Sequence, residues 1–164
     1  MIQLRAIEPE DLDLLYTIEN NRELWNIGAT NVPYSRYVLH DYIAQSSGDI
    51  YTDRQVRLII EAEGKTVGII DLQNFSPRHN RAEVGIVVQK AWRRRGYALQ
   101  AIQELASYAR RTLHLHQLYA VVEEENNAAR QLFEKAGFKC ETTLKQWLYD
   151  GRTYRNARLL QIIL

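Results

Sequence analysis

The sequence has almost no cysteine and no long apolar run. Cys140 is the only cysteine among 164 residues, so the chain can form neither an internal disulfide nor a cysteine-rich metal site. Its neighbours Lys139 and Glu141 favour an edge or buried strand thiol over a nucleophile. The start, MIQLRAIEPEDLD, lacks the apolar core of a signal peptide, and no apolar run approaches membrane length. These absences predict a cytoplasmic chain that does not enter a membrane.

An excess of charge of either sign is missing as well. Lys and Arg number 21 against 20 for Asp and Glu, so no overall field attracts nucleic acid or an anionic membrane. There are three prolines, and we find no repeat and no low-complexity linker. Residues 1–164 are therefore predicted to form a single domain, which is long enough to bury a core. Any function that depends on charge must be local.

The spacing of apolar residues predicts seven strands and four helices in the order β-α-α-β-β-β-α-β-α-β-β. The predicted helices begin at or near Pro9, Ser35, Tyr97 and Asn126. Turns at Gly64 and at Asp150-Gly151 mark two hairpins. Because a helix crossover joins the strands that flank the helix from Tyr97, these two must be parallel. The prediction is an α/β (α+β) fold with a mixed, mostly antiparallel twisted sheet and helices on both faces.

The stretch AWRRRGYALQ, residues 91–100, concentrates positive charge at a turn from a strand into a helix. The first N–H groups of a helix lack intrahelical partners and, with the helix dipole, favour a bound anion. Gly96 would let the backbone approach such a ligand. No Lys-Ser or Lys-Thr follows a glycine here, and the glycines of a dinucleotide fingerprint are absent, so nucleotides are poor candidates. The residues alone leave an anion cradle and a solvated basic helix start as alternatives.

The context of this turn resembles the GCN5-related N-acetyltransferase (GNAT) superfamily. RRRGYA fits Arg-x-x-Gly-x-Ala and is similar to the pyrophosphate-binding motif of that family. VVEEENNAARQLFEKAGF is similar to the family's next segment, and YDGRTYRNARLL to the closing hairpin of the branch with bacterial spermidine and ribosomal-protein N-acetyltransferases. The resemblance covers residues 2–164. It implies acetyl-CoA as donor, no metal, and a primary amine of a small molecule or a protein N-terminus as acceptor.

The resemblance also implies which residues bind acetyl-CoA. Strand amides for the pantetheine arm and the thioester carbonyl would come from Ile86, Val87 and Val88. The pyrophosphate would be wrapped, chiefly by backbone N–H groups, by Arg93, Arg94, Arg95, Gly96, Tyr97 and Ala98. The next helix would contribute Asn126 at the pantetheine, and Arg130 and Lys135 at phosphate. A simple helix cap is the alternative or additional role of Asn126.

Attack on a thioester needs a neutral amine, so a proton must leave an ammonium whose pKa is about 10. By the resemblance, Glu83 is the carboxylate that takes this proton through water. The alternative is an outward-facing strand glutamate paired with Arg81. Asp71, on the preceding strand, is the second candidate base.

Relatives of this branch often protonate the leaving thiolate with a tyrosine in Leu-Tyr-Glu-Lys-x-Gly-Phe. This chain reads LFEKAGF and carries Phe133 at that position. Three explanations stay open: another tyrosine substitutes (Tyr149 or Tyr154), water protonates the thiolate, or catalysis is impaired. Impaired catalysis leaves a second hypothesis open, in which the chain is a weak or inactive module that binds and senses acyl-CoA.

The acceptor pocket is predicted to be aromatic rather than acidic. Glu19, Glu23, Asp41 and Asp49 are scattered, whereas an aromatic set is available in Trp25, Tyr34, Trp147 and Tyr149. A nucleic-acid role for the three arginines is disfavoured, because charge is balanced and no aromatic residues interleave with the basic ones. An exposed strand edge in the last hairpin favours a homodimer.

Overall fold

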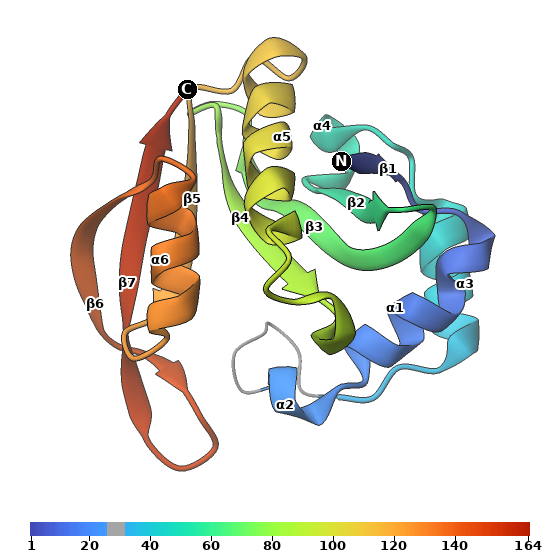
Figure 1. Ribbon diagram of the computed structural model, residues 1–164, viewed down its shortest axis with the longest axis horizontal. Coiled ribbons are helices and arrows are strands. Elements are labelled where there is room, and N and C mark those ends of the chain that lie inside the picture. Colours follow the sequence, from blue (N-terminus) through green and yellow to red (C-terminus); the bar gives the residue numbers. More distant parts are fainter. Residues whose placement is uncertain (26–31) are drawn as a thin grey trace.

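Seven strands form one twisted sheet in the computed structural model, which describes residues 1–25 and 32–164 (Figure 1). The strands are β1 (Ile2–Ala6), β2 (Val56–Ala62), β3 (Lys65–Ser76), β4 (Arg81–Val88), β5 (Gln117–Glu123), β6 (Lys139–Tyr149) and β7 (Tyr154–Ile163). Their order is β1-β2-β3-β4-β5-β7-β6. Within the described ranges, β4 and β5 are the only parallel neighbours. The predicted mixed, mostly antiparallel sheet is therefore confirmed.

Helices and short 3-10 turns connect these strands. They are η1 (Pro9–Asp11), α1 (Leu12–Glu19), α2 (Arg22–Trp25), α3 (Arg36–Gln45), α4 (Ile50–Asp53), η2 (Lys90–Trp92), α5 (Tyr97–Arg111) and α6 (Asn127–Lys135). The four predicted helices correspond to α1, α3, α5 and α6. The sequence did not predict α2 and α4, because four residues are too few to show a helical period. No helix of residues 1–25 and 32–164 has the length and apolar character needed to span a membrane.

The helices cover both faces of the sheet, as predicted. On one face α5 buries Ala101, Ile102 and Leu105 in the main core, which Phe133 of α6 joins. On the other face, α1 and α3 pack against a second cluster that contains Ile59 and Ile69. These two isoleucines are cross-strand partners on β2 and β3, so they project to the same side of the sheet.

The parallel pairing of β4 and β5 is short. It joins Arg81 to Gln117, Ala82 to Leu118 and Glu83 to Tyr119, and it ends there. Both strands continue beyond that point, to Val88 and to Glu123. Figure 1 shows them diverging, with α5 in front of the sheet beside β4 and α6 in front of β5 and β7. An opening in the sheet therefore lies between the two halves of the molecule.

Gly68 brings β3 very close to β4. A Cβ atom at this position would lie 2.3 Å from the carbonyl oxygen of Val87 and 3.0 Å from the Cα of Val88. We expect Gly68→Ala to lower the free energy of unfolding by about 1–3 kcal/mol, because backbone must move to relieve the clash. Gly85→Ala is the control, since its Cβ would have no neighbour nearer than 3.5 Å. Equal urea denaturation midpoints for the two variants would contradict this expectation.

Candidate functional site

Two backbone amides of β4 face the opening. The N–H of Gln89 donates to the carbonyl of Val67 at 2.9 Å, and the register continues with Val87 opposite Ile69. Because successive residues of a strand point their polar groups in opposite directions, Val87 faces β3. Ile86 and Val88 then turn their N–H groups toward the β5 side, where the ladder has already ended. The amide of Val87 belongs to the β3–β4 ladder, so a ligand in the opening meets only those of Ile86 and Val88.

The turn formed by residues 93–96, called the arginine turn below, places further amides at the mouth of this opening. Arg94 and Gly96 have positive φ angles of 61° and 81°. Gly96 is the N-cap of α5, and its carbonyl accepts the N–H of Gln100 at 3.1 Å, which begins the helical ladder. The first-turn N–H groups of α5 therefore precede the intrahelical ladder. When residues with positive and negative φ angles alternate at a helix start, their N–H groups form a concavity that can bind an anion.

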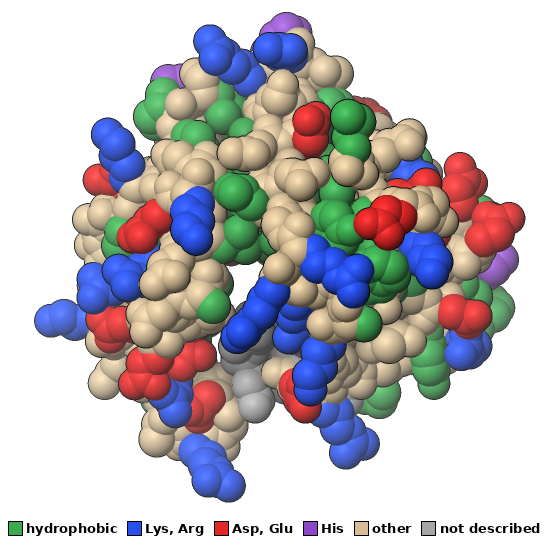
Figure 2. Space-filling model, in the orientation of Figure 1, with side chains coloured by type: hydrophobic (Ala, Val, Ile, Leu, Met, Phe, Trp, Pro, Cys, Tyr) green, Lys and Arg blue, Asp and Glu red, His purple; other side chains and the backbone are tan. Residues whose placement is uncertain are grey.

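The arginine side chains have different partners. Arg93 donates from Nε to the carbonyl of Val88 at 2.9 Å, which ties the turn to the end of β4. Arg95 lies over the ring of Trp92, 4.9 Å from its centroid, while Arg94 is exposed. Tyr97 is buried and its hydroxyl donates to Glu63 at 2.9 Å. Figure 2 shows a hollow near the middle of this face with Lys and Arg side chains along its margin.

The start of α6 lies on the other side of the opening (Figure 1). Asn126 caps α6, because its Oδ1 accepts the N–H of Ala129 at 3.1 Å. Its side-chain NH2 group is a second, donating function that the cap does not use. Arg130 lies 3.8 Å from Glu134, and Lys135 is exposed in the last turn. The alternative role of Asn126 as a helix cap is thus present, and it is compatible with ligand binding.

Glu83 occupies the last β4–β5 pair, where the strands begin to diverge. Its Oε2 accepts a hydrogen bond of 2.7 Å from Nδ2 of Asn74. Asn74 has a φ of 51° and lies where the β3–β4 register is interrupted. In the described part of the chain the partner of Glu83 is Asn74 and not Arg81, so the carboxylate is held at the base of the opening.

Asp71 is tied into a buried ionic cluster. Arg57 donates to its two carboxylate oxygens at 2.8 and 3.2 Å, and to Glu19 at 2.7 Å. Burial works against the charge of Arg57, but Asp71 and Glu19 outweigh it and raise the pKa of the guanidinium above its usual range. Burial also raises the pKa of Asp71, and Arg57 binds both of its oxygens, so the carboxylate is part of an ion pair. The geometry therefore favours Glu83 over Asp71 as the base.

Phe133 is a core residue. Its ring is 4% exposed and lies 5.1 Å from the ring of Phe138 in an edge-to-face arrangement. Tyr149 and Tyr154 are 56% and 66% exposed, and their rings lie 5.1 Å apart on the last hairpin. The hairpin tyrosines therefore contact each other.

The side chains of three of the four aromatic residues predicted for the acceptor pocket lie within the described part of the chain, on two separate surfaces. Tyr34 packs on the cluster beneath α1 and α3, and its backbone is held by Asn20. Trp147 and Tyr149 are exposed on the outer strand β6, and the side chain of Trp25 lies outside the described residues. The described aromatic residues thus belong to two separate surfaces, and an aromatic acceptor pocket stays a prediction.

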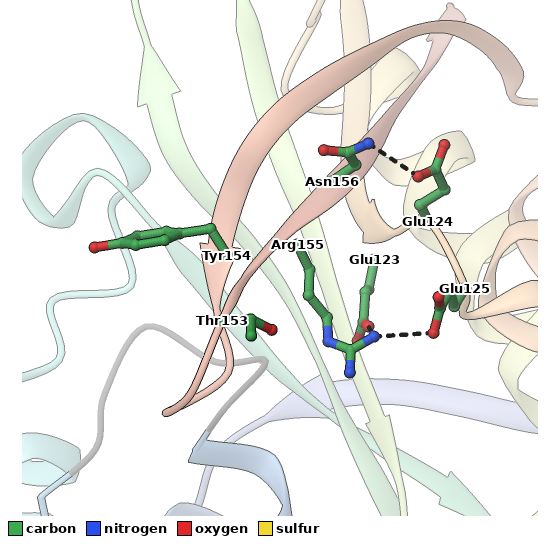
Figure 3. Close-up of a pocket in the computed structure, with 7 residues that line it drawn as sticks. All are labelled: Glu123, Glu124, Glu125, Thr153, Tyr154, Arg155 and Asn156. Carbon is green, nitrogen blue, oxygen red and sulfur yellow. Dashed lines mark hydrogen bonds and ion pairs between the residues drawn. The ribbon is translucent and has the colours of Figure 1, made fainter.

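A polar depression of about 310 Å³ adjoins the end of β5 (Figure 3). It is lined by Glu123, Glu124, Glu125, Thr153, Tyr154, Arg155 and Asn156. Arg155 lies 2.9 Å from Glu125 and 3.5 Å from Glu123, and Asn156 donates to Glu124 at 3.1 Å. Each glutamate thus has a partner on β7, which joins the closing hairpin to the strand next to the opening. This depression was not predicted from the sequence, although three consecutive glutamates before a helix cap signal it.

Known proteins share this sequence and architecture. Residues 2–139 match the acetyltransferase (GNAT) domain family. The spermidine N(1)-acetyltransferase of Escherichia coli K12 is 29% identical over 157 residues, which cover 95% of this chain and 82% of that protein. The putative ribosomal N-acetyltransferase YdaF of Bacillus subtilis is 27% identical over 153 residues, covering 90% of this chain and 83% of that protein.

A crystal structure of spermidine N-acetyltransferase from Vibrio cholerae, in complex with CoA and spermine, has the same fold. It superposes with a TM-score of 0.86 at 26% identity, over 99% of this chain and 95% of that chain. Enzymes of this family use acetyl-CoA as co-substrate. The free strand amides and the cationic helix start suit the two ends of that molecule, the thioester arm and the phosphates. The chain belongs to the GNAT family and is an acetyl-CoA-dependent N-acetyltransferase.

Proposed function

We propose that this chain acetylates a primary amine of a small molecule or of a protein N-terminus by direct attack on the thioester. The observation that carries the proposal is the divergence of β4 and β5 directly after Glu83. It places a carboxylate at the base of an opening toward which the β4 edge turns its amides. Spermidine is the first acceptor to test, because the matched enzymes of Escherichia coli and Vibrio cholerae are named for it.

The N–H groups of Ile86 and Val88 would hold the pantetheine arm and the thioester carbonyl. A donor aimed at the developing oxyanion is typically worth about 10²–10³ in rate. The amides of Arg93 to Ala98 would wrap the pyrophosphate, with the Arg94 side chain exposed nearby. Asn126 would donate its NH2 group to the pantetheine, and Arg130 and Lys135 would approach phosphate from α6. Val87 would contribute through its side chain alone, because its amide is part of the ladder with β3.

Glu83 would take the proton that the acceptor ammonium must lose, directly or through one water. The hydrogen bond from Asn74 holds Oε2 and leaves Oε1 for that proton. Residues 1–164 would act as one catalytic domain. The predicted homodimer stays a proposal: a relative from Vibrio cholerae has a dodecameric structure, so the exposed edge of the last hairpin can serve larger assemblies as well.

A panel of acceptors tests the proposed function. CoA release from acetyl-CoA is measured with spermidine, an L-amino acid and a short peptide with a free N-terminus, and the products are identified by mass spectrometry. Thiol reagents also react with the exposed Cys140, so a Cys140→Ser background is used. Acetylation of any of these amines supports the proposal, and the amine acetylated at the highest rate identifies the acceptor class. Acetyl-CoA binding without turnover of any amine would favour the sensing module instead.

A further inference from the structure

The buried Phe133 leaves α6 without a hydroxyl for the reaction, whereas β5 carries a tyrosine beside Glu83. Tyr119 is its direct partner in the last rung of the β4–β5 ladder. Paired residues of adjacent strands project to the same face of the sheet, with their strands about 4.8 Å apart. The phenol of Tyr119 and the carboxylate of Glu83 are therefore neighbours at the point where the sheet opens.

Other tyrosines of the described chain are engaged elsewhere. The hydroxyl of Tyr97 donates to Glu63, and that of Tyr42 accepts from Gln55. Tyr16 lies beneath Arg36, and Tyr51 packs edge-to-face on Phe75. The hairpin pair contact each other. None of these contacts involves Glu83.

The surroundings of Tyr119 keep its phenol protonated. Burial raises its pKa, and the negative charge of Glu83 raises it further, while Arg81 acts in the opposite direction. On its other side Tyr119 pairs with Gln161 of β7, whose side chain donates to Gln117 at 3.0 Å and carries no charge. Tyr119 is partly exposed, so its side chain is not sealed within the core.

We propose that Tyr119 is a catalytic residue that protonates the leaving sulfur, and that Glu83 and Tyr119 form one proton relay held in place by Asn74. The proposal rests on the proposed function, in which Glu83 is the base. Asn74 acts only through Glu83 and is a positioning residue.

The relay balances its protons. The acceptor ammonium first loses one proton to Glu83, which releases it to solvent. Glu83 then takes a second proton from the attacking amine as the C–N bond forms. Tyr119 gives its proton to the sulfur as the C–S bond to the acyl carbon breaks. The proton on Glu83 then passes to the phenolate oxygen of Tyr119, which restores the carboxylate and the phenol.

The order of basicities favours this sequence. A phenol, whose ordinary pKa is about 10, is a weak acid toward a thiolate whose conjugate acid has an ordinary pKa of about 8.5. The phenolate, however, is more basic than a carboxylate by about 6 pKa units, so the proton on Glu83 moves to it at once. The relay is thus favourable only when both residues act together. The increases in activation free energy caused by removing each residue are therefore predicted not to add in the double variant.

Steady-state kinetics of Tyr119→Phe test the proposal. We expect kcat to fall by about 100-fold with little change in KM, since a general acid is typically worth about 10²–10⁴. Tyr108→Phe, a partly buried tyrosine of α5, is the matched control and should keep the wild-type rate. The double variant Glu83→Gln/Tyr119→Phe should be about as slow as the slower single variant. The relay is overturned if the fall in kcat of the double variant equals the product of the falls of the two single variants. It is also overturned if kcat of Tyr119→Phe lies within about threefold of the wild type.

A second readout needs no turnover. The Cζ carbon of Tyr119 is followed by NMR in protein with ¹³C-labelled tyrosine, and the signal is assigned by its loss in Tyr119→Phe. Glu83→Gln should lower the pKa of this phenol, because it removes a neighbouring negative charge. An unchanged titration would show that the two side chains are not neighbours and would overturn the proposal. If Glu83→Gln is slow while Tyr119→Phe is not, the relay fails but the proposed function stands; if no amine is acetylated, the proposed function itself fails.

Discussion

Gly96→Glu is expected to reduce acetyl-CoA affinity by about 100-fold or more. The substitution adds a negative side chain where the pyrophosphate would approach the first amides of α5. It also forces a residue with a Cβ into a φ of 81°, which distorts the turn. Loss of two hydrogen bonds to a charged group, at about 1.5 kcal/mol each, already accounts for a factor of this size. Isothermal titration calorimetry measures it directly.

Gly48→Glu is the matched control for that experiment. Gly48 has a similar φ of 70°, and a Cβ atom there would have nothing within 4 Å, but it lies between α3 and α4, away from the opening. Its variant should bind acetyl-CoA as the wild type does. Unchanged binding by Gly96→Glu would mean that the arginine turn does not hold the cofactor.

Glu83→Gln is expected to lower kcat by about 100-fold at pH 7, since a positioned base typically contributes about 10²–10⁴. The deficit should shrink as the pH approaches about 10, because the acceptor amine then loses its proton to bulk water. The amide keeps the size of the side chain, so acetyl-CoA binding should be preserved. The measurement is a pH–rate profile of both proteins under saturating acetyl-CoA.

The control for Glu83 is Glu141→Gln, which makes the same change at an exposed position of β6 and should leave the profile unaltered. A Glu83→Gln profile that runs parallel to the wild type at every pH would remove Glu83 from proton transfer. If Glu83→Gln weakened acetyl-CoA binding by as large a factor as it lowers kcat, Glu83 would have a structural role.

Local sequence signals predicted most of the fold. The helix expected to begin at Tyr97 is α5, which begins there and ends at Arg111, because its apolar spacing and the glycine before it agree. Asn126 caps the start of α6 as expected, and Gly137, with a φ of 100°, follows its end. The single parallel pair followed from the crossover through α5. The arginine turn was identified as a site for the same local reasons.

The chemistry at the base of the opening depends on strand register, which no local pattern specifies. That β4 and β5 part directly after Glu83, and that Tyr119 faces it, follows only from the three-dimensional pairing. Register also decides that Ile86 and Val88, but not Val87, present amides to the opening. The sequence showed Tyr119 only as one of ten tyrosines, in a strand where aromatic residues commonly serve packing.

The most direct test of the site is amide hydrogen exchange measured residue by residue, with and without acetyl-CoA. Binding should slow exchange at Ile86 and Val88 and at Gly96 to Ala98, whose N–H groups would acquire acceptors from the ligand. Val87 should be protected already in the free protein and change little, because it bonds to β3. Slowed exchange confined to other parts of the chain, with these amides unaffected, would contradict the placement of the cofactor between β4 and β5.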